Sequence, residues 1–134
     1  MSARVRIQTD AAPTAIGPYS QAIRAGAFVF TAGQVGADPS TGELADGVAA
    51  QADRALSNLE AVLRAAGTGM DRVVKTTIFL VEMGDFSAVN EAYERHVAAP
   101  HPARSTVAVA ALPKGALVEI EMVALAGGED SGSP

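Results

Sequence analysis

The stretch that decides the fold covers residues 102–124 and reads PARSTVAVAALPKGALVEIEMVA. Strand side chains point alternately to the two faces of a sheet, and the alternation here predicts strands over 104–109 and 118–124. Two consecutive strands pair most simply as a hairpin. The long connection over 110–117 also allows another strand to lie between them.

Both predicted strands carry charge where a core strand would not. The aliphatic side chains of 118–124 share one face, which leaves Glu119 and Glu121 on the other. In 104–109 the aliphatic side chains likewise lie opposite Arg104. If the aliphatic faces pack against the body of the protein, the arginine and the carboxylates project together from the opposite face. We therefore expect the functional site on that face.

Length, composition and charge exclude several classes of protein. A chain of 134 residues is expected to form one domain that buries roughly 65–70% of the surface of its unfolded chain. Cysteine is absent, so disulfides and a cysteine nucleophile are excluded, and we expect a cytoplasmic protein. The net charge is −5 and the basic residues are scattered, so nucleic acid is not the expected partner.

Neither a secretory signal nor a run of ~20 apolar residues is present, so we expect a soluble protein without a membrane partner. The polar, glycine-rich residues 127–134 are predicted to form a flexible tail after a folded domain over 1–126.

The remaining periodicity predicts four more strands and two helices. The strands cover 5–8, 21–24, 28–34 and 72–81, and the helices cover 48–66 and 86–97. This order indicates an α+β domain with a mixed six-stranded sheet and two helices on one face. The run 72–81 is typical of a central strand that is buried on both faces. The sheet face that no helix covers predicts a homo-oligomer.

Five single residues are candidates for a functional site. Tyr19 ends a stiff loop with two prolines, where it either fills the core or places its hydroxyl at the lip of a pocket. Gly33 permits either a main-chain carbonyl that faces a ligand or a β-bulge. Asn90 either reaches a pocket edge or faces water. His96 and His101 have no further donors at ligand spacing, so no metal site is expected.

Short motifs occur along the chain in a characteristic order. They are IGPYSQ at 16–21, TAGQ at 31–34, VKTT at 74–77, Phe86 through Asn90 to Tyr93, PARS at 102–105, LPKG at 112–115 and EIE at 119–121. Together they resemble the RidA/YjgF family of small imine deaminases over roughly residues 5–126. Several motifs in order and at matching spacing are far more specific than one short pattern.

The resemblance implies a chorismate-mutase-like fold that assembles as a homotrimer. The sheets of the trimer form the inside of a barrel, and the ligand clefts lie at the boundaries between subunits. It also implies that the fourth predicted strand lies between the fifth and the sixth, which favours the skipped position over the hairpin.

The resemblance further implies hydrolysis of 2-iminoacids, or of enamine tautomers such as 2-aminoacrylate, to 2-oxoacids and ammonia. The expected substrates are 2-iminopropanoate and 2-iminobutanoate, which pyridoxal-phosphate-dependent dehydratases release from serine and threonine. By position, Arg104 holds the substrate carboxylate, and Glu119 orients or activates the water. The residues that match positions lining the cleft are Tyr19, Gly33, Asn90 and Thr106.

The chemistry of a 2-iminoacid suits these residue types. A guanidinium can hold a carboxylate through two parallel hydrogen bonds, each contributing on the order of 1.5–3 kcal/mol. A carboxylate acting as general base typically accelerates a reaction ~10²–10⁴-fold. Burial in a cleft would raise the pKa of Glu119, whereas Arg104 nearby would lower it. The Gly33 carbonyl can accept the imine N–H, and neither a metal nor a cofactor is required.

Two positions depart from the best-known bacterial pattern of the family. Thr106 stands where many members have a cysteine, and Ala32 stands where many have a serine. A catalytic thiol is thereby excluded, although a threonine hydroxyl can still hold a water. The loss of the serine hydroxyl puts rate and substrate preference in question.

Three other interpretations remain open. In the first, Arg104 and Glu119 are only an ion pair between subunits that fixes the register of the trimer. In the second, the cleft binds small 2-oxoacids without catalysis, which requires Arg104 but not Glu119. A third function, RNA cleavage with inhibition of translation, is attributed to some relatives, but the acidic charge and the lack of paired histidines argue against it.

Overall fold

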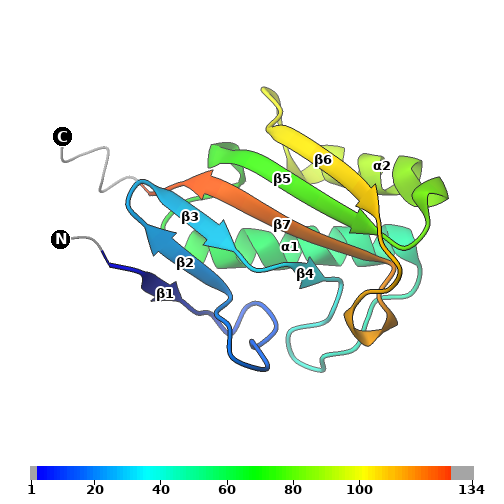
Figure 1. Cartoon of the computed structure of the whole chain (residues 1–134), viewed down its shortest axis with the longest axis horizontal. Helices are drawn as coiled ribbons and strands as arrows, with labels where there is room; N and C mark the ends of the chain where they lie inside the picture. The colour runs from blue at the N-terminus through cyan, green and yellow to red at the C-terminus, as the bar shows by residue number, and fades with distance from the viewer. Residues whose placement is uncertain (1–2, 128–134) are drawn as a thin grey trace.

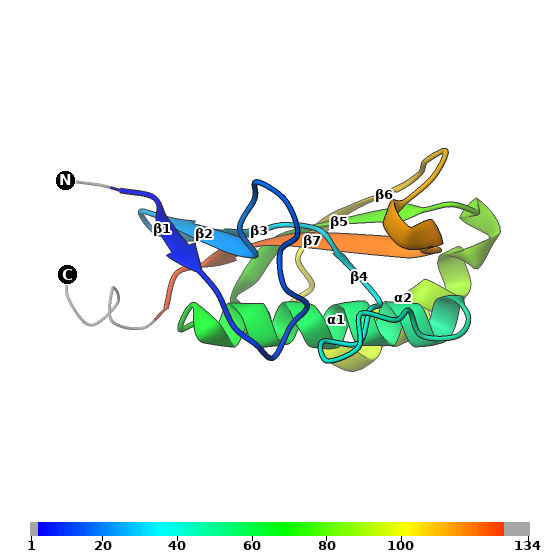
Figure 2. The ribbon, with the colours of Figure 1, turned by 90° about the horizontal axis from the view of Figure 1, so that it is seen from below.

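Two helices cover one face of a seven-stranded mixed sheet in the computed structural model, which describes residues 3–127 (Figures 1 and 2). The strands are β1 Val5–Ile7, β2 Ala22–Ala25, β3 Phe28–Thr31, β4 Gln34–Val35, β5 Val73–Leu80, β6 Ala103–Ala108 and β7 Val118–Leu125. The helices are α1 Val48–Ala65 and α2 Phe86–His96, and short 3-10 turns cover Met70–Arg72, Met83–Asp85 and Pro113–Gly115. The predicted α+β class is confirmed; of the predicted tail 127–134, residues 128–134 lie outside the described residues.

The predicted count of six strands is wrong because the strand expected over 28–34 is two strands. The sheet order is β1-β2-β3-β7-β5-β6, and β4 pairs separately with β7. Phe28 lies opposite Leu125 and Gln34 lies opposite Ile120, so both pieces follow the same partner strand. The interruption falls at Ala32 and Gly33, where the chain passes over β7.

The last two strands do not form a hairpin. β5 lies between β6 and β7, antiparallel to β7 and parallel to β6. The crossover from β5 to the parallel β6 runs through α2, as a parallel connection requires. The resemblance therefore predicted the strand order correctly, and the connection over 110–117 spans the skipped position.

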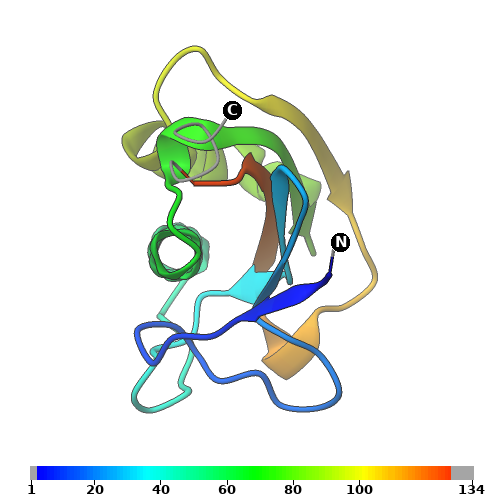
Figure 3. The same ribbon diagram turned by 90° about the vertical axis from the view of Figure 1, so that its left-hand side faces the viewer.

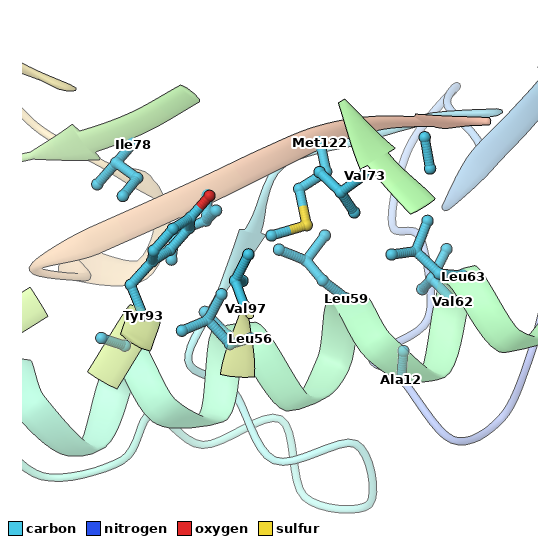
Figure 4. Packing of buried hydrophobic residues seen from close by; sticks show 14 of the residues in the cluster. Ala12, Leu56, Leu59, Val62, Leu63, Val73, Ile78, Tyr93, Val97 and Met122 are labelled. Carbon is cyan, nitrogen blue, oxygen red and sulfur yellow. The ribbon is translucent and has the colours of Figure 1, made fainter. Parts of the chain in front are cut away.

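The hydrophobic core lies between the sheet and α1. Figure 4 shows Leu56, Leu59 and Leu63 pointing from the helix toward the sheet, where Met122 of β7 meets them, and each leucine is fully buried. Burial of one such side chain stabilises the fold by about 1.5–3 kcal/mol. The predicted aliphatic face of 118–124 is therefore the inner face of the sheet.

Strand β5 lies next to the edge strand β6 and is buried on one face, so the prediction of a central strand buried on both faces is wrong. Thr76, Ile78 and Leu80 are fully buried against the helices, whereas the side chains that alternate with them are partly exposed. Seen from the end of the molecule, both helices lie on the same side of the curved sheet (Figure 3). The opposite face of the sheet has no covering element among residues 3–127.

Candidate functional site

The structure places Arg104 and Glu119 on opposite faces of the sheet, which corrects the expectation that they project together. Arg104 pairs in register with Thr76 of β5, and that row of side chains points toward the helices. Glu119 pairs with Phe79 and lies on the uncovered face. The prediction assumed that the aliphatic side of β6 points inward. At this sheet edge the register with β5 decides the face, and Val107 is left 42% exposed.

One half of the candidate site is built around Arg104, and we call it the arginine half-site. The guanidinium carbon lies 4.9 Å from the ring centre of Tyr93 and 5.5 Å from that of Phe86. Its Nη2 donates a hydrogen bond of 2.6 Å to Asn90 Oδ1. Each cation–π contact of this kind contributes about 0.5–2 kcal/mol. The half-site borders a cavity of about 310 Å³ that is also lined by His101.

Helix α2 supplies this half-site through its spacing. Phe86, Asn90 and Tyr93 follow one another at intervals of four and three residues, so they share one face of the helix. The last turn of α2 is tied to α1 by a contact of 2.7 Å between His96 Nε2 and Asp53 Oδ1. The helix therefore holds three side chains around the guanidinium while its own position against α1 is fixed.

The other half lies around Glu119 in a cavity of about 600 Å³, and we call it the carboxylate half-site. The loop that precedes β2 contributes Tyr19, the break between β3 and β4 contributes Gly33, and the turn before β7 contributes Lys114. Lys114 Nζ donates a hydrogen bond of 2.6 Å to the carbonyl oxygen of Gly42, which joins two walls of the cavity. This volume falls within the ~300–1,000 Å³ typical of small-molecule sites.

Glycine at position 33 makes room for the Glu119 carboxylate. A Cβ placed on Gly33 would lie 1.9 Å from Oε2 and 2.7 Å from Cδ of Glu119. The role of the Gly33 carbonyl toward a ligand stays a prediction. The alternative of a β-bulge is confirmed, because Phe30 pairs with Val123 and Gln34 with Ile120, which leaves one extra residue on this strand across the break.

Burial raises the pKa of Glu119, and the neighbouring Glu121 carboxylate raises it further. Arg104 lies on the other face and does not lower this pKa within one chain. In the single subunit, the effect of burial on the pKa of Glu119 therefore prevails over that of Arg104. A carboxyl group whose pKa is raised in this way is better suited to accept a proton.

Buried amide side chains hold the loops that wall the carboxylate half-site. Gln21 Nε2 donates to three backbone carbonyls in the loop before β2, at 2.7–3.3 Å, and its Oε1 accepts from the N–H of Thr9. Asn58 of α1 donates to the carbonyls of Val35 and Ala37. Gln51 joins the carbonyl of Ala45 to the N–H of Leu117. These bonds fix loops that would otherwise be free.

The structure decides where several of the candidate residues lie. Tyr19 is 55% exposed and borders the carboxylate half-site, so it lies at a pocket lip and not in the core. Asn90 reaches a pocket edge by its bond to Arg104. Thr106 lies on the same face as Arg104 but lines neither of the two cavities.

Sequence reasoning missed the functional side of two aromatic residues and of the buried amides. In the sequence, Phe86 and Tyr93 mark only the ends of a motif, and their spacing from Asn90 is the signal that could have revealed a shared face. Among residues 3–127, no three His, Cys, Asp or Glu side chains group as metal ligands would. Over the same range no helix is long and apolar enough to cross a membrane.

Over residues 3–127 these features define an α+β domain with one uncovered sheet face and two cavities, one beside Arg104 and one beside Glu119. Residues 9–126 match the sequence model of the family described as Endoribonuclease L-PSP. The chain belongs to the RidA/YjgF family.

Relatives and solved structures agree with this assignment. The 2-iminobutanoate/2-iminopropanoate deaminase of Homo sapiens is 48% identical over 130 residues, which cover 95% of each chain. The crystal structure of RidA from an Antarctic Psychrobacter is 46% identical, with a TM-score of 0.89 over 91% of this chain and 99% of that one. Escherichia coli TdcF with bound serine is 40% identical, with a TM-score of 0.86 over 90% of this chain and 98% of that one.

Proposed function

We propose that the protein hydrolyses 2-iminoacids to 2-oxoacids and ammonia at sites that form between neighbouring chains. Each site would take Arg104 from one chain and Glu119 from the next. The observation that carries the proposal is that one chain holds these two groups on opposite faces of its sheet, each in its own cavity. Relatives named 2-iminobutanoate/2-iminopropanoate deaminase support the choice of reaction. The proposed location is the cytoplasm.

The proposed assembly is a homotrimer. The uncovered sheet face exposes Phe28, Phe30 and Leu125, with Val107 at its edge. An apolar surface of this kind on a soluble protein is usually covered by a partner. Packing of this face against neighbouring copies would close the sheets into a barrel, and each arginine half-site would then border the carboxylate half-site of another chain.

In this scheme Arg104 binds the substrate carboxylate. Asn90 occupies one N–H of the guanidinium, and four of its five N–H donors remain for other partners. The rings of Phe86 and Tyr93 support the guanidinium. Two of the remaining donors can then form two parallel hydrogen bonds with a carboxylate. The group that binds the substrate is in this way oriented before the substrate arrives.

Glu119 would act as the general base. It takes a proton from water as the water oxygen bonds to the imine carbon, and the electron pair of the C=N bond moves to nitrogen. Glu119 would then give this proton to the nitrogen of the tetrahedral intermediate. As the C–N bond breaks and ammonia leaves, the hydroxyl oxygen would form the C=O bond of the 2-oxoacid and return its proton to Glu119. The Gly33 carbonyl would accept the imine N–H and so favour the protonated, more electrophilic imine. Tyr19 would close the lip of the cleft.

Subunit complementation tests the proposal. Arg104→Ala and Glu119→Gln chains should each form trimers that fail to hydrolyse 2-iminobutanoate generated in situ. Co-assembly of equal amounts leaves about one boundary in four with both native groups. About a quarter of the wild-type rate should therefore return. Mixed trimers without activity would refute a shared site.

The main alternative is a module that binds small 2-oxoacids without catalysis. Glu119→Ala separates the two functions when ligand affinity and ammonia release are measured on the same protein. A binding module would keep its affinity and have no activity to lose, whereas the deaminase would keep binding and lose ammonia release.

The family description names an endoribonuclease, so RNA cleavage is the second alternative. The net charge of −5 does not favour a phosphate-binding surface. His96 is engaged with Asp53, and His101 lies by the arginine half-site. RNA binding that falls steeply as salt rises would favour this alternative over the deaminase.

A further inference from the structure

We propose that Tyr93 and Thr76 are a positioning pair, which orients Arg104 for the carboxylate of the substrate. The inference rests on the proposed function, because it assigns a role to residues behind the proposed carboxylate-binding group. Neither residue would touch the substrate itself. Their effect would be exerted through the plane and direction of the guanidinium.

A series of contacts connects strand β5 to the arginine half-site. The Tyr93 hydroxyl donates a hydrogen bond of 2.9 Å to Thr76 Oγ1. Thr76 is fully buried on β5, and Tyr93 is 4% exposed. Figure 4 shows the Tyr93 side chain rising from α2 with its hydroxyl oxygen toward the sheet. The face of the same ring lies 4.9 Å from the Arg104 guanidinium carbon.

Packing alone does not require this pair of hydroxyls. Thr76 stands in a row with Ile78 and Leu80 on β5 and beside Met122 of β7, all of them buried and apolar. A buried hydroxyl loses its hydration and must find a partner, whereas two apolar groups of the same shape can replace a bonded pair at little cost. Valine and phenylalanine would fill the same space, so the hydroxyl pair points to orientation.

The pair fixes the ring in two directions. The backbone of α2 sets the position of the Tyr93 ring, and the bond to Thr76 restricts its tilt. A ring of fixed tilt gives the guanidinium above it one surface to rest on, 4.9 Å from ring centre to guanidinium carbon, and Asn90 restricts rotation of the guanidinium through the 2.6 Å bond to Nη2. With tilt and rotation both set, the fork of free N–H donors points in one direction.

Three variants test the proposal by separating fold stability from ligand affinity. Thr76→Val and Tyr93→Phe each remove one hydroxyl and leave the other one buried without a hydrogen-bond partner. Both single variants should therefore have a lower melting temperature. The double variant should recover the wild-type melting temperature but bind 2-oxobutanoate about three- to tenfold more weakly, with KM raised and kcat within about twofold. Thr77→Val, the same substitution on the opposite face of β5, is the matched control and should leave affinity unchanged. A double variant with wild-type affinity would overturn the proposal.

A spectroscopic measurement keeps this test separate from the deaminase proposal. In ¹⁵N-arginine-labelled protein the Nε–Hε signal of Arg104 reports its position over the aromatic ring, with or without ligand. The signal should shift in the double variant and stay in place in Thr77→Val. An unshifted signal would overturn the positioning role. If the signal shifts in the double variant but the wild-type protein releases no ammonia, the deaminase proposal alone is refuted.

Discussion

Gly33→Ala is the sharpest perturbation of the carboxylate half-site. Gly33 does not adopt the left-handed conformation that favours glycine, so alanine fits the backbone. The new methyl carbon would stand 1.9 Å from Glu119 Oε2, where ordinary contact begins at 3.4 Å. The carboxylate oxygen must therefore move by about 1.5 Å, and a misplacement of ~1 Å can lower a rate ~10²-fold.

The expected cost in stability is small by comparison. The displaced group is the end of a flexible, partly exposed side chain, and alanine restricts the unfolded chain more than glycine does, which contributes about 0.4–1 kcal/mol in favour of folding. We therefore expect the free energy of unfolding to change by less than about 1 kcal/mol. The rate of ammonia release should fall at least ~10²-fold, with ligand affinity largely retained.

The assay measures ammonia release from 2-iminobutanoate generated in situ, alongside urea denaturation. Gly84→Ala is the matched control, because a Cβ there meets nothing within 4 Å and the backbone is not left-handed. It should retain wild-type activity. Wild-type turnover in Gly33→Ala would refute the reasoning, since the carboxylate would then function from a displaced position.

Four further predictions follow from the geometry. Gly36→Ala places a Cβ 2.3 Å from the backbone oxygen of Gln51, which cannot yield as a side chain can, so urea denaturation should show a loss of roughly 3 kcal/mol or more. Gln21→Leu should cost about 1–3 kcal/mol and speed hydrogen exchange in the loop that this amide holds. Because burial raises the folded-state pKa of Glu119 in the single chain, its charged form lowers stability above that pKa, and this cost is absent below the unfolded value. In the dilute, dissociated subunit Glu119→Gln should therefore raise the melting temperature at neutral pH and not in acid, as thermal denaturation would show. Arg104→Lys keeps the charge but not the fork, and KM should rise about tenfold.

The fold was largely predictable because its strongest patterns are unambiguous. In β7 every inward position is aliphatic, and the outward positions include two glutamates, so the alternation has one solution. The split of the third strand was expected only as one of two options for Gly33, a β-bulge. Phe30 pairs with Val123 and Gln34 with Ile120, so this strand has one residue more than β7 across the break and the faces do not follow one unbroken alternation.

The candidate site was predicted in its members more than in its arrangement. The rule that aliphatic side chains point inward placed Arg104 on the wrong face, because it cannot see the register that pairs this residue with Thr76. Tyr93 is buried in the core, and its ring also contacts the guanidinium. One aromatic residue can do both, and spacing alone reports only burial.

Because the guanidinium and the carboxylate lie on opposite faces of the sheet, the proposed active site exists only where two chains meet, and its population depends on the concentration of chains. Turnover per chain would fall on dilution as the assembly dissociates, even though every subunit stays folded. A subunit that assembles but lacks both groups would silence the two boundaries it shares with intact neighbours. In a cell that makes both chains, an inactive chain that still assembles would therefore lower activity more than the loss of one gene copy.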